Sequence, residues 1–151
     1  MKQPDWVAID WGTSNLRIWG MSDSGELLQE FCSEVGMSRL SPDQYESVLV
    51  DAISCWLIDR VRPLTILICG SATNRQGWRE VPYLETPCEP MGSRIRIETN
   101  DPMVEVYLLG GVSQSTPAAV MRGEEIQLLG AISSGISEGL FCLPGTHSKW
   151  V

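Results

Sequence analysis

The stretch that decides the fold is Asp10-Trp11-Gly12-Thr13-Ser14-Asn15-Leu16-Arg17. Apolar runs flank it, from Trp6 to Trp11 and from Asn15 to Met21, so the stretch predicts a tight turn between two strands. Gly12 lets the backbone approach a ligand, and consecutive N–H groups in such a turn form an anion-binding nest. Thr13 and Ser14 add hydroxyl donors. The turn therefore predicts a phosphate-binding site.

Asp10 and Arg17 put one charge on each of the two strands that this turn connects. A carboxylate at the end of a buried strand can hold Mg²⁺ through water, because this ion keeps much of its hydration shell. The alternative is a plain hairpin turn that Asp10 caps; the whole eight-residue pattern between two N-terminal strands favours phosphate binding. Neither G-x-x-x-x-G-K-[ST] nor G-x-G-x-x-G occurs in the sequence, which excludes P-loop and Rossmann sites.

The next segments predict a third strand and a helix. Ser22 to Gly25 is a hairpin turn and Glu26 to Val35 continues as a strand, so three antiparallel strands open the chain. A helix start follows, with Ser41 as N-cap and Pro42 at the first helical position. Apolar residues then recur at helical spacing; they are Tyr45, Val48, Leu49, Ala52, Ile53, Trp56 and Leu57.

The rest of the chain alternates short strands with loops and one further helix. The β-branched-rich run from Leu64 to Cys69 is typical of a buried parallel strand. Residues 71–92 are rich in Gly, Pro, Arg and Trp and have no period, and loops this long are usually functional. The other elements that we expect are strands Arg94–Ile97, Val104–Leu109 and Leu140–Leu143, a helix Glu124–Ile132, and a strand that begins at Lys149.

The sequence ends at Trp150-Val151, inside what the pattern indicates is a strand. Termini are usually polar and exposed, so we expect a chain that is cut inside a second lobe. The first lobe is then expected over residues 1–138, and residues 139–151 are expected to be a hairpin that starts the second. An exposed apolar strand with an unpaired edge favours self-association, so we expect a dimer or a larger homo-oligomer.

Composition excludes several classes of partner. The 151 residues are 43% hydrophobic and 20% charged, which is typical of a globular protein. The formal net charge is −8 and the sequence pI is about 4.6. We expect neither nucleic acid nor a membrane surface as a partner, because both select clustered Lys and Arg. An anionic small molecule needs only a local positive pocket and is compatible with this charge.

The cysteines and the N-terminus indicate the cellular compartment. Five widely spaced cysteines without a C-x-x-C pair predict neither a disulfide framework nor a zinc site. Cys55, Cys69 and Cys142 lie in apolar runs and are predicted to be buried. Asp5 and Asp10 come too early for a signal peptide, and no stretch reaches transmembrane length. We therefore expect a cytoplasmic protein.

The N-terminal turn resembles, in form and position, the first phosphate loop of the sugar kinase, heat-shock chaperone and actin superfamily. Gly123-Glu124 opens a helix where kinases of the glycerol-kinase type have a Gly-Asp pair whose carboxylate is the base. Gly145-Thr146 stands where these kinases have a hairpin that touches phosphate. The resemblance implies an α/β fold, namely an actin-like ATPase (ribonuclease H-like) lobe with a mixed sheet, three N-terminal antiparallel strands and flanking helices.

Four motifs together resemble the 2-keto-3-deoxygalactonate kinases, and the resemblance covers essentially the whole chain. They are D-W-G-T-S-N-L-R at 10–17, G-W-R-E-V-P-Y at 77–83, M-R-G-E-E-I-Q-L-L-G at 121–130 and L-P-G-T-H-S-K-W-V at 143–151. Two places depart from the family. Gly70 to Asn74 replaces a Gly-Met-Val-Gly-type run, which bears on substrate geometry, and Ile126 replaces a Thr, which bears on packing.

The resemblance implies a kinase that transfers the γ-phosphate of ATP, with Mg²⁺, to the 6-hydroxyl of 2-dehydro-3-deoxy-D-galactonate. Glu124 is then expected to be the catalytic base, and Asp10 the catalytic carboxylate that organises the metal. The residues expected to bind the phosphates of ATP are Gly12, Thr13, Ser14, Asn15, Arg17, Gly145, Thr146 and Lys149. Lys149 alternatively only flanks its strand, and His147, the one histidine, is expected to contact phosphate or to make a structural hydrogen bond.

The loop from Asn74 to Tyr83 is the expected substrate loop. Because a sugar acid presents a carboxylate and hydroxyls, Arg75 is expected to pair with the carboxylate. Asn74 and Gln76 are expected to bond hydroxyls. Trp78 is expected to cover an apolar sugar face, or alternatively to anchor the loop to the core. Arg122 and Glu125 complete the expected substrate contacts. For Glu125 the alternative is a carboxylate that only favours a helix N-terminus.

Two other functions stay open at this point. One is a non-catalytic lobe of such a kinase, and the other is an ATPase of the same superfamily without a sugar substrate. In the actin-like architecture ATP lies between two lobes, so the 151 residues alone are expected to have no significant kinase activity. The sequence leaves open whether a galactonate-derived or a gluconate-derived acid is the substrate.

Overall fold

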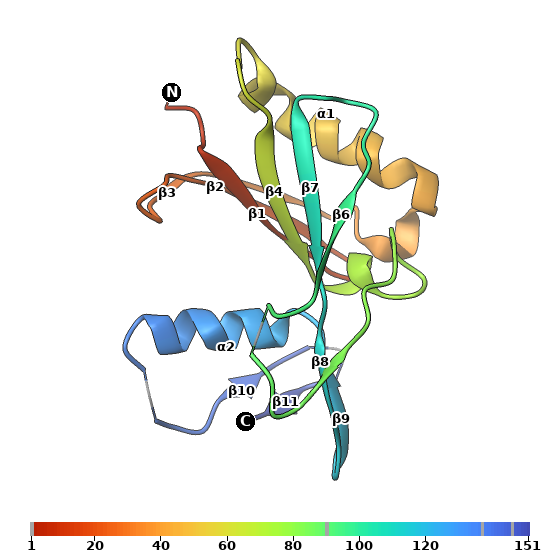
Figure 1. Cartoon of the computed structure of the whole chain (residues 1–151), viewed down its shortest axis with the longest axis vertical. Coiled ribbons are helices and arrows are strands. Elements are labelled where there is room, and N and C mark those ends of the chain that lie inside the picture. The colour runs from red at the N-terminus through yellow and green to blue at the C-terminus, as the bar shows by residue number, and fades with distance from the viewer. Residues whose placement is uncertain (1, 90, 137, 146) are drawn as a thin grey trace.

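The upper part of the molecule is a six-stranded sheet with one helix packed against it (Figure 1). The computed structural model describes residues 2–89, 91–136, 138–145 and 147–151. The strands of this sheet are β1 (Trp6–Trp11), β2 (Leu16–Met21), β3 (Leu27–Ser33), β4 (Leu64–Cys69), β6 (Arg94–Ile97) and β7 (Val104–Leu109). The helix is α1 (Tyr45–Leu57).

The strand order is β3-β2-β1-β4-β7-β6. β1, β2 and β3 pair antiparallel, whereas β4 runs parallel to both β1 and β7. β6 closes the sheet in the antiparallel direction. The prediction of a mixed sheet that begins with three antiparallel strands is therefore confirmed. Since β1, β4 and β7 are parallel, their carboxyl ends meet at one edge, where ligands usually bind in α/β sheets.

Alternation along the strands explains which face is buried. Val7, Ile9 and Trp11 of β1 are 0–2% exposed, and the residues between them are half-buried. Tyr45 and Leu49 are among the α1 residues that pack on this face, together with Ile53 and Trp56. This apolar face holds the helix to the sheet by the hydrophobic effect.

The start of α1 differs in one detail from the prediction. Pro42–Gln44 form a short 3₁₀ turn, and α1 itself begins at Tyr45. Ser41 and Gln44 make the reciprocal bonds of a capping box at that turn. The predicted Ser41 cap and Pro42 first position therefore belong to a 3₁₀ turn, which commonly precedes an α-helix.

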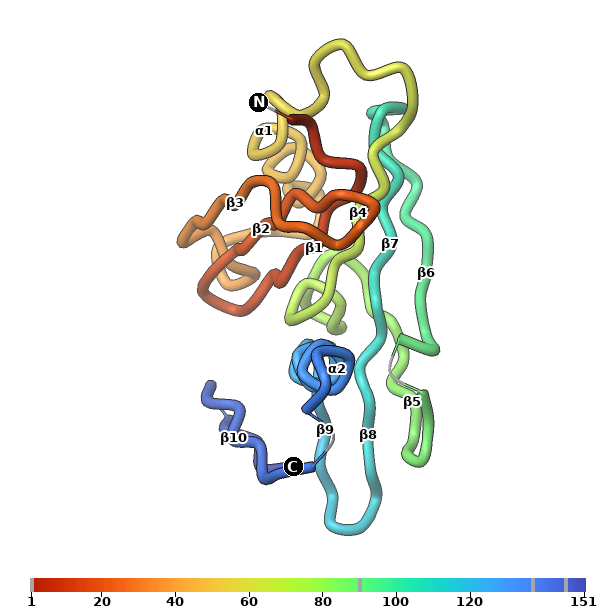
Figure 2. The backbone as a smooth tube through the Cα atoms, turned by 90° about the vertical axis from the view of Figure 1, so that its left-hand side faces the viewer, coloured from red at the N-terminus to blue at the C-terminus, as the bar shows by residue number. Residues whose placement is uncertain are grey.

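The lower part of the molecule contains a second sheet, a helix and a strand pair (Figures 1 and 2). Figure 2 shows β7 continuing into β8, so one length of chain joins the two sheets. By the bounds of the two strands, Gly110 and Gly111 lie between them. The elements are β5 (Leu84–Glu85), β8 (Val112–Ser115), β9 (Ala118–Met121), α2 (Glu124–Ser133), β10 (Cys142–Leu143) and β11 (Lys149–Trp150).

The sequence analysis missed β5 and the β8–β9 hairpin. The hairpin contains Ser113-Gln114-Ser115-Thr116-Pro117, a polar run that lacks the apolar alternation of a half-buried strand. The strand expected over Leu140–Leu143 is shorter: β10 comprises Cys142 and Leu143, and Phe141 before it exchanges two backbone hydrogen bonds with Val151. The division at residue 138 stays a prediction, and β10 and β11 do form a sheet of their own.

The cysteines are all free thiols, but only one of the three predicted to be buried is so. Cys69 ends β4 inside the protein, whereas Cys55 and Cys142 are exposed. Cys55 lies on the outer side of α1, so its position in an apolar run misled the prediction. Neither of the helices in the described part of the chain has the length and hydropathy that crossing a bilayer requires.

A segment after β3 braces the turn between β1 and β2. The backbone N–H groups of Met37 and Ser38 donate to the carbonyls of Gly12 and Thr13, at 3.0 Å each. Gly36 lies so close to the turn that a Cβ there would stand 2.3 Å from the carbonyl carbon of Ser14. Only a residue without a side chain allows this contact between two backbones.

We expect Gly36→Ala to destabilise the fold and Gly130→Ala to stabilise it. An added methyl at Gly36 meets backbone atoms that cannot turn away, and overpacking of this kind costs about 1–3 kcal/mol. Gly130 lies in α2 with open space around it, where alanine gains about 1 kcal/mol of helix propensity. Thermal unfolding measures both, at about 2–4 °C per kcal/mol for a chain of this size. Equal Tm values for the two variants would contradict the bracing role of Gly36.

Candidate active site

A cavity of about 400 Å³ lies where the carboxyl ends of β1 and β4 face the N-terminus of α2. It is lined by segments that are far apart in the sequence: the β1–β2 turn, the residues after β4, the end of β9 and the β10–β11 connection. The predicted site residues that line it are Asp10, Gly12, Thr13, Ser14, Asn15, Arg17, Asn74, Arg122, Glu124, Gly145 and Lys149. The fold thus brings together most of the residues singled out from the sequence.

The β1–β2 turn presents polar groups to this cavity. The N–H of Gly12 donates to the carbonyl of Asn15 at 2.9 Å and closes the turn. Among the described residues, the backbone N–H groups of Thr13 and Ser14 have no protein acceptor, and both residues are exposed. The Thr13 hydroxyl lies 3.0 Å from that of Ser71, which follows β4. Free N–H groups and hydroxyls at a glycine turn suit an anion.

Asp10 is the last but one residue of β1 and the most enclosed charged group of the turn region. Its Oδ2 accepts a hydrogen bond from Nη1 of Arg17 at 3.3 Å, and its side chain is 21% exposed. Burial raises the pKa of Asp10 above its ordinary value; the Arg17 guanidinium opposes this rise and the Glu124 carboxylate adds to it. A cation beside a carboxylate that is largely shielded from water stabilises its charged form.

Two glycines let the N-terminus of α2 approach Asp10. Gly70, with φ of 89°, follows β4, and Gly123, with φ of 113°, precedes α2. A Cβ on Gly70 would lie 2.8 Å from Asp10 Oδ1, and a Cβ on Gly123 would lie 3.4 Å from the Cα of Gly70. The positive φ angles favour glycine at both positions, and at Gly70 the space is also too small for a Cβ.

Glu124 and Glu125 begin α2 and point to different surroundings. Glu124 lines the cavity, and its Oε2 accepts a hydrogen bond from the N–H of Arg122 at 2.8 Å. Glu125 is 3% exposed, and its Oε2 accepts from the N–H of Gly123 at 2.8 Å. Burial raises the pKa of Glu125, and hydrogen bonds from backbone N–H groups oppose this rise. The sequence left open which of the two faces a substrate, and the geometry favours Glu124.

Arg122 lines the cavity but uses its guanidinium to hold the loop after β4. Nη1 donates to the carbonyl and the hydroxyl of Thr73, and Nη2 donates to the carbonyl of Val81 at 3.0 Å. Its guanidinium carbon also lies 4.0 Å from the ring centroid of Tyr83. The predicted substrate contact of Arg122 stays a prediction, and the structure adds a role in positioning the loop.

The other loop residues divide between a second cavity and the core. Asn74 borders the first cavity, and also a neighbouring one of about 240 Å³ that Arg75 lines. Trp78 lies elsewhere: its ring stacks on Tyr45 with 5.6 Å between centroids and meets Trp11 edge-on at 6.4 Å. It therefore packs against the hydrophobic core and lines neither cavity. The structure agrees with the alternative in which Trp78 anchors the loop to the core. It does not support a role for Trp78 in stacking on the sugar.

The turn between β10 and β11 faces the β1–β2 turn across the first cavity. Gly145, His147 and Lys149 line it from this side. Thr146 lies outside the described residues. Lys149 lines the cavity from β11, as the phosphate-contact prediction requires.

The sequence analysis assigned no individual role to several residues that line the site, although most of them lie in motifs or loops that it singled out: Gly70, Ser71, Tyr83, Gly123 and Gln127. Glycine directly after a buried strand was a usable signal for Gly70. Tyr83 and Gln127 carried no signal, because their place depends on where the loop and α2 cross the sheet edge. The described residues contain no cluster of three His, Cys, Asp or Glu side chains that would suit a metal ion by itself.

Comparisons with known proteins point to one family. The family model described as 2-keto-3-deoxy-galactonokinase matches residues 10–151, which includes every element from the end of β1 onward. A protein of Rhizobium meliloti (strain 1021), described as a probable 2-dehydro-3-deoxygalactonokinase (DgoK1), is 39% identical over 152 residues. The 2-dehydro-3-deoxygalactonokinase of Escherichia coli (strain K12) is 34% identical over 148 residues.

A solved structure shows the same fold. The crystal structure of a protein from Sinorhizobium meliloti, described as a 2-dehydro-3-deoxygalactonokinase, superposes with a TM-score of 0.82 at 38% identity. It covers 97% of this chain, as the two curated relatives do, and the match takes up 48% of each of these proteins. The chain spans about half the length of the relatives it matches, and by the family match over residues 10–151 it belongs to the 2-keto-3-deoxygalactonokinase family.

Proposed function

We propose that this chain supplies the phosphate-binding turn and the catalytic base of a sugar-acid kinase. The reaction transfers the γ-phosphate of ATP to the 6-hydroxyl of 2-dehydro-3-deoxy-D-galactonate. The observation that carries the proposal is one cavity that unites the β1–β2 turn, Asp10 and Glu124. The relatives' names support the substrate, and the chain's own residues support the reaction type.

ATP and Mg²⁺ fit the residues of this cavity. The free N–H groups of Thr13 and Ser14 suit phosphate oxygens, and Arg17 and Lys149 add positive charge. Asp10 is the carboxylate that would hold Mg²⁺, which needs few protein ligands because water and phosphates complete its shell. When bound, the metal offsets negative charge on the phosphates.

Glu124 is the group that accepts the proton. The oxygen of the substrate hydroxyl forms a bond to the γ-phosphorus, the bond from that phosphorus to the bridging oxygen of ADP breaks, and the hydroxyl proton passes to the Glu124 carboxylate. The N–H of Arg122 holds Oε2 of Glu124 in place, so the other oxygen is free to turn to the substrate. The turn binds the phosphoryl oxygens while this happens.

The strand order bears on which lobe of a two-lobed kinase this chain forms. The order β3-β2-β1-β4-β7 with three leading antiparallel strands supports an actin-like lobe over residues 1–138. Residues 139–151, with the β10–β11 pair, would begin a second lobe. In this architecture the adenosine binds to the second lobe, so we propose that turnover requires a protein of the relatives' length.

The direct test is an ADP-release assay with 2-dehydro-3-deoxygalactonate, followed by ³¹P NMR of the product. We expect a 6-phosphate ester from the full-length gene product that carries this chain. Binding of both substrates without ADP release would favour the non-catalytic alternative. ADP release that does not depend on any sugar acid would favour the ATPase alternative.

We expect Glu124→Gln to lower kcat far more than Glu125→Gln does. A positioned base is worth roughly 10²–10⁴-fold in rate, whereas a carboxylate at a helix end contributes about 0.3–1 kcal/mol of stability. Because Glu125 is buried, its variant is expected to act on Tm instead. Steady-state kinetics and thermal unfolding of the two matched variants measure this split. A larger loss of kcat in Glu125→Gln would assign the base to the other carboxylate.

We expect Asp10→Asn to lower kcat more than tenfold while it preserves the fold. Burial is the main cause of the raised pKa of Asp10, so folding stabilises the neutral carboxyl relative to the charged one. Below the ordinary carboxyl pKa both proteins are neutral at this position. As the pH rises through the raised pKa, the Asp10 carboxyl of the wild type becomes charged and the folded state loses stability. The Asn side chain stays neutral, so the variant does not lose stability in this way.

Thermal unfolding between pH 4 and pH 7 checks this sign. The Tm of Asp10→Asn relative to wild type is expected to rise with pH across that interval. Turnover within tenfold of wild type, or a Tm difference that falls as the pH rises, would contradict the assignment of Asp10.

A further inference from the structure

Two adjoining cavities share one wall. The first, of about 400 Å³, contains the β1–β2 turn and Glu124; the second, of about 240 Å³, lies beside it along the loop after β4. Asn74, Tyr83 and Arg122 line both. A ligand that fills both cavities must therefore pass along these three residues.

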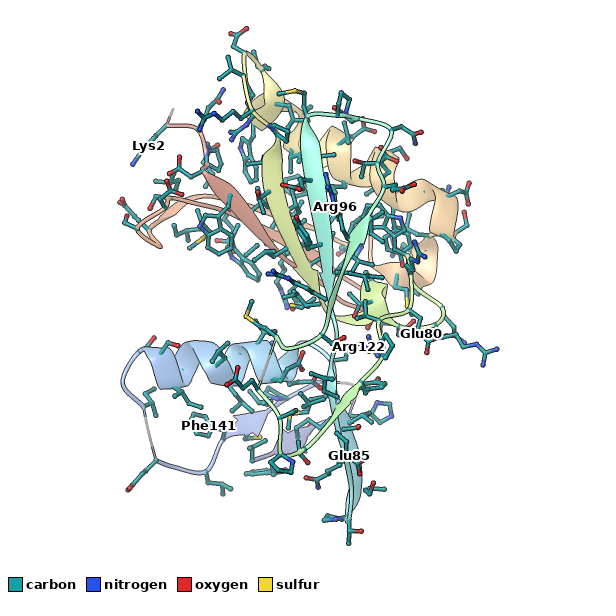
Figure 3. All side chains as sticks on the ribbon, in the orientation of Figure 1. Lys2, Glu80, Glu85, Arg96, Arg122 and Phe141 are labelled. Atoms are coloured by element: carbon teal, nitrogen blue, oxygen red, sulfur yellow. The ribbon has the colours of Figure 1, made fainter. Side chains whose placement is uncertain are left out.

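The residues that line only one of the two cavities differ in chemistry. Glu124 stands in the first, and Arg75 stands in the second with Glu80. Arg75 makes no hydrogen bond or ion pair within the described residues, so its guanidinium is free for a ligand. Figure 3 shows Glu80 and Arg122 where the upper sheet meets the lower part of the molecule. Glu80 can accept hydrogen bonds from hydroxyls.

Contacts on two sides hold the Tyr83 ring of the shared wall in place. The Arg122 guanidinium lies 4.0 Å from the centre of its ring, and Arg122 is itself bonded to Thr73 and Val81. On another side a Cβ at Gly111 would lie 2.9 Å from a ring carbon, so glycine is needed for the ring to sit there. The N–H of Leu84, the next residue, donates to the carbonyl of Gly111 at 3.0 Å.

The rest of the Tyr83 side chain is available to a ligand. It is 38% exposed, and its hydroxyl bonds to no protein group in the part of the chain that the structure describes. A fixed aromatic ring with a free hydroxyl offers both an apolar surface and a hydrogen bond. Trp78, for which the sequence left a sugar contact and a core anchor both open, packs in the core.

We propose that Tyr83 is a substrate-binding residue that holds the carbon chain of the sugar acid between Glu124 and Arg75. This rests on the proposed function. The terminal hydroxyl of the substrate lies at Glu124, the carboxylate at the opposite end pairs with Arg75, and the Tyr83 hydroxyl bonds an oxygen between them. Arg122 is a positioning residue that keeps the Tyr83 ring in place.

The test compares Tyr83→Phe, Tyr83→Leu and Arg75→Ala in the full-length gene product. Tyr83→Phe loses one hydrogen bond, which we expect to raise KM for the sugar acid about 2- to 10-fold. Tyr83→Leu also loses the ring and is expected to raise that KM about tenfold or more. KM for ATP is expected to stay within about twofold in both. Tyr83→Phe keeps the test valid if Tyr83→Leu does not fold.

A second substrate separates the two ends of the site. With the carboxamide of the sugar acid, the charged pair to Arg75 is lost, and such a pair is worth about one to two decades of affinity. Arg75→Ala is therefore expected to remove the preference for the acid over the carboxamide. Tyr83→Leu is expected to weaken the binding of both the acid and the carboxamide and to leave the preference for the acid unchanged.

Tyr107→Phe and Tyr107→Leu are the matched controls. Tyr107 lies on β7 with its hydroxyl bonded to Glu105 at 2.9 Å, and it lines neither cavity. If the wild type phosphorylates the acid and the Tyr83 variants behave like these controls, the inference on Tyr83 is wrong and the proposed function stands. If the wild type neither phosphorylates the acid nor binds it by calorimetry, the proposed function is wrong and this inference falls with it.

Discussion

The N-terminus of α2 reaches Asp10 because two glycines stand between the sheet and the helix. Gly70 and Gly123 have positive φ angles, and a Cβ on Gly70 would enter the space of the Asp10 carboxylate. This close approach forms one wall of the cavity and brings Glu124 toward the turn between β1 and β2. The arrangement also gathers negative charge, since Glu124 adds to the rise in the pKa of Asp10 that burial causes. The Arg17 guanidinium compensates part of this negative charge, and a metal ion beside the two carboxylates would compensate more of it.

Two aromatic residues of the loop after β4 have different roles. Trp78 fixes it to the core through Tyr45 and Trp11, whereas Tyr83 stands at the boundary of the two cavities. Arg122 connects these functions, because its guanidinium holds backbone carbonyls of the loop and covers one side of the Tyr83 ring. Such support from neighbouring side chains keeps a binding site in its productive geometry before a ligand arrives.

Local sequence signals predicted the elements that build the site, and the contacts across the sheet edge escaped them. β1, β4, β6 and β7 occur with the expected bounds, since short apolar runs between glycines, prolines and turns define them well. The phosphate turn and the start of α2 were equally visible. The polar β8–β9 hairpin was missed, because its strands depend on pairing with each other and not on an apolar face. The sequence left open whether Trp78 contacts the substrate or anchors the loop, and it gave Tyr83 no role beyond ending that loop, because only the folded loop decides which ring turns inward.

The central claim is that the cavity between the β1–β2 turn and Glu124 is where the phosphoryl group is transferred. The measurement that tests it most directly is a crystal structure of the full-length gene product with Mg²⁺, a non-hydrolysable ATP analogue and 2-dehydro-3-deoxygalactonate. We predict the γ-phosphate against Thr13 and Ser14, and the 6-hydroxyl of the sugar acid within hydrogen-bond distance of Glu124. A nucleotide phosphate bound away from this turn, or a sugar acid whose 6-hydroxyl faces away from Glu124, would contradict the account.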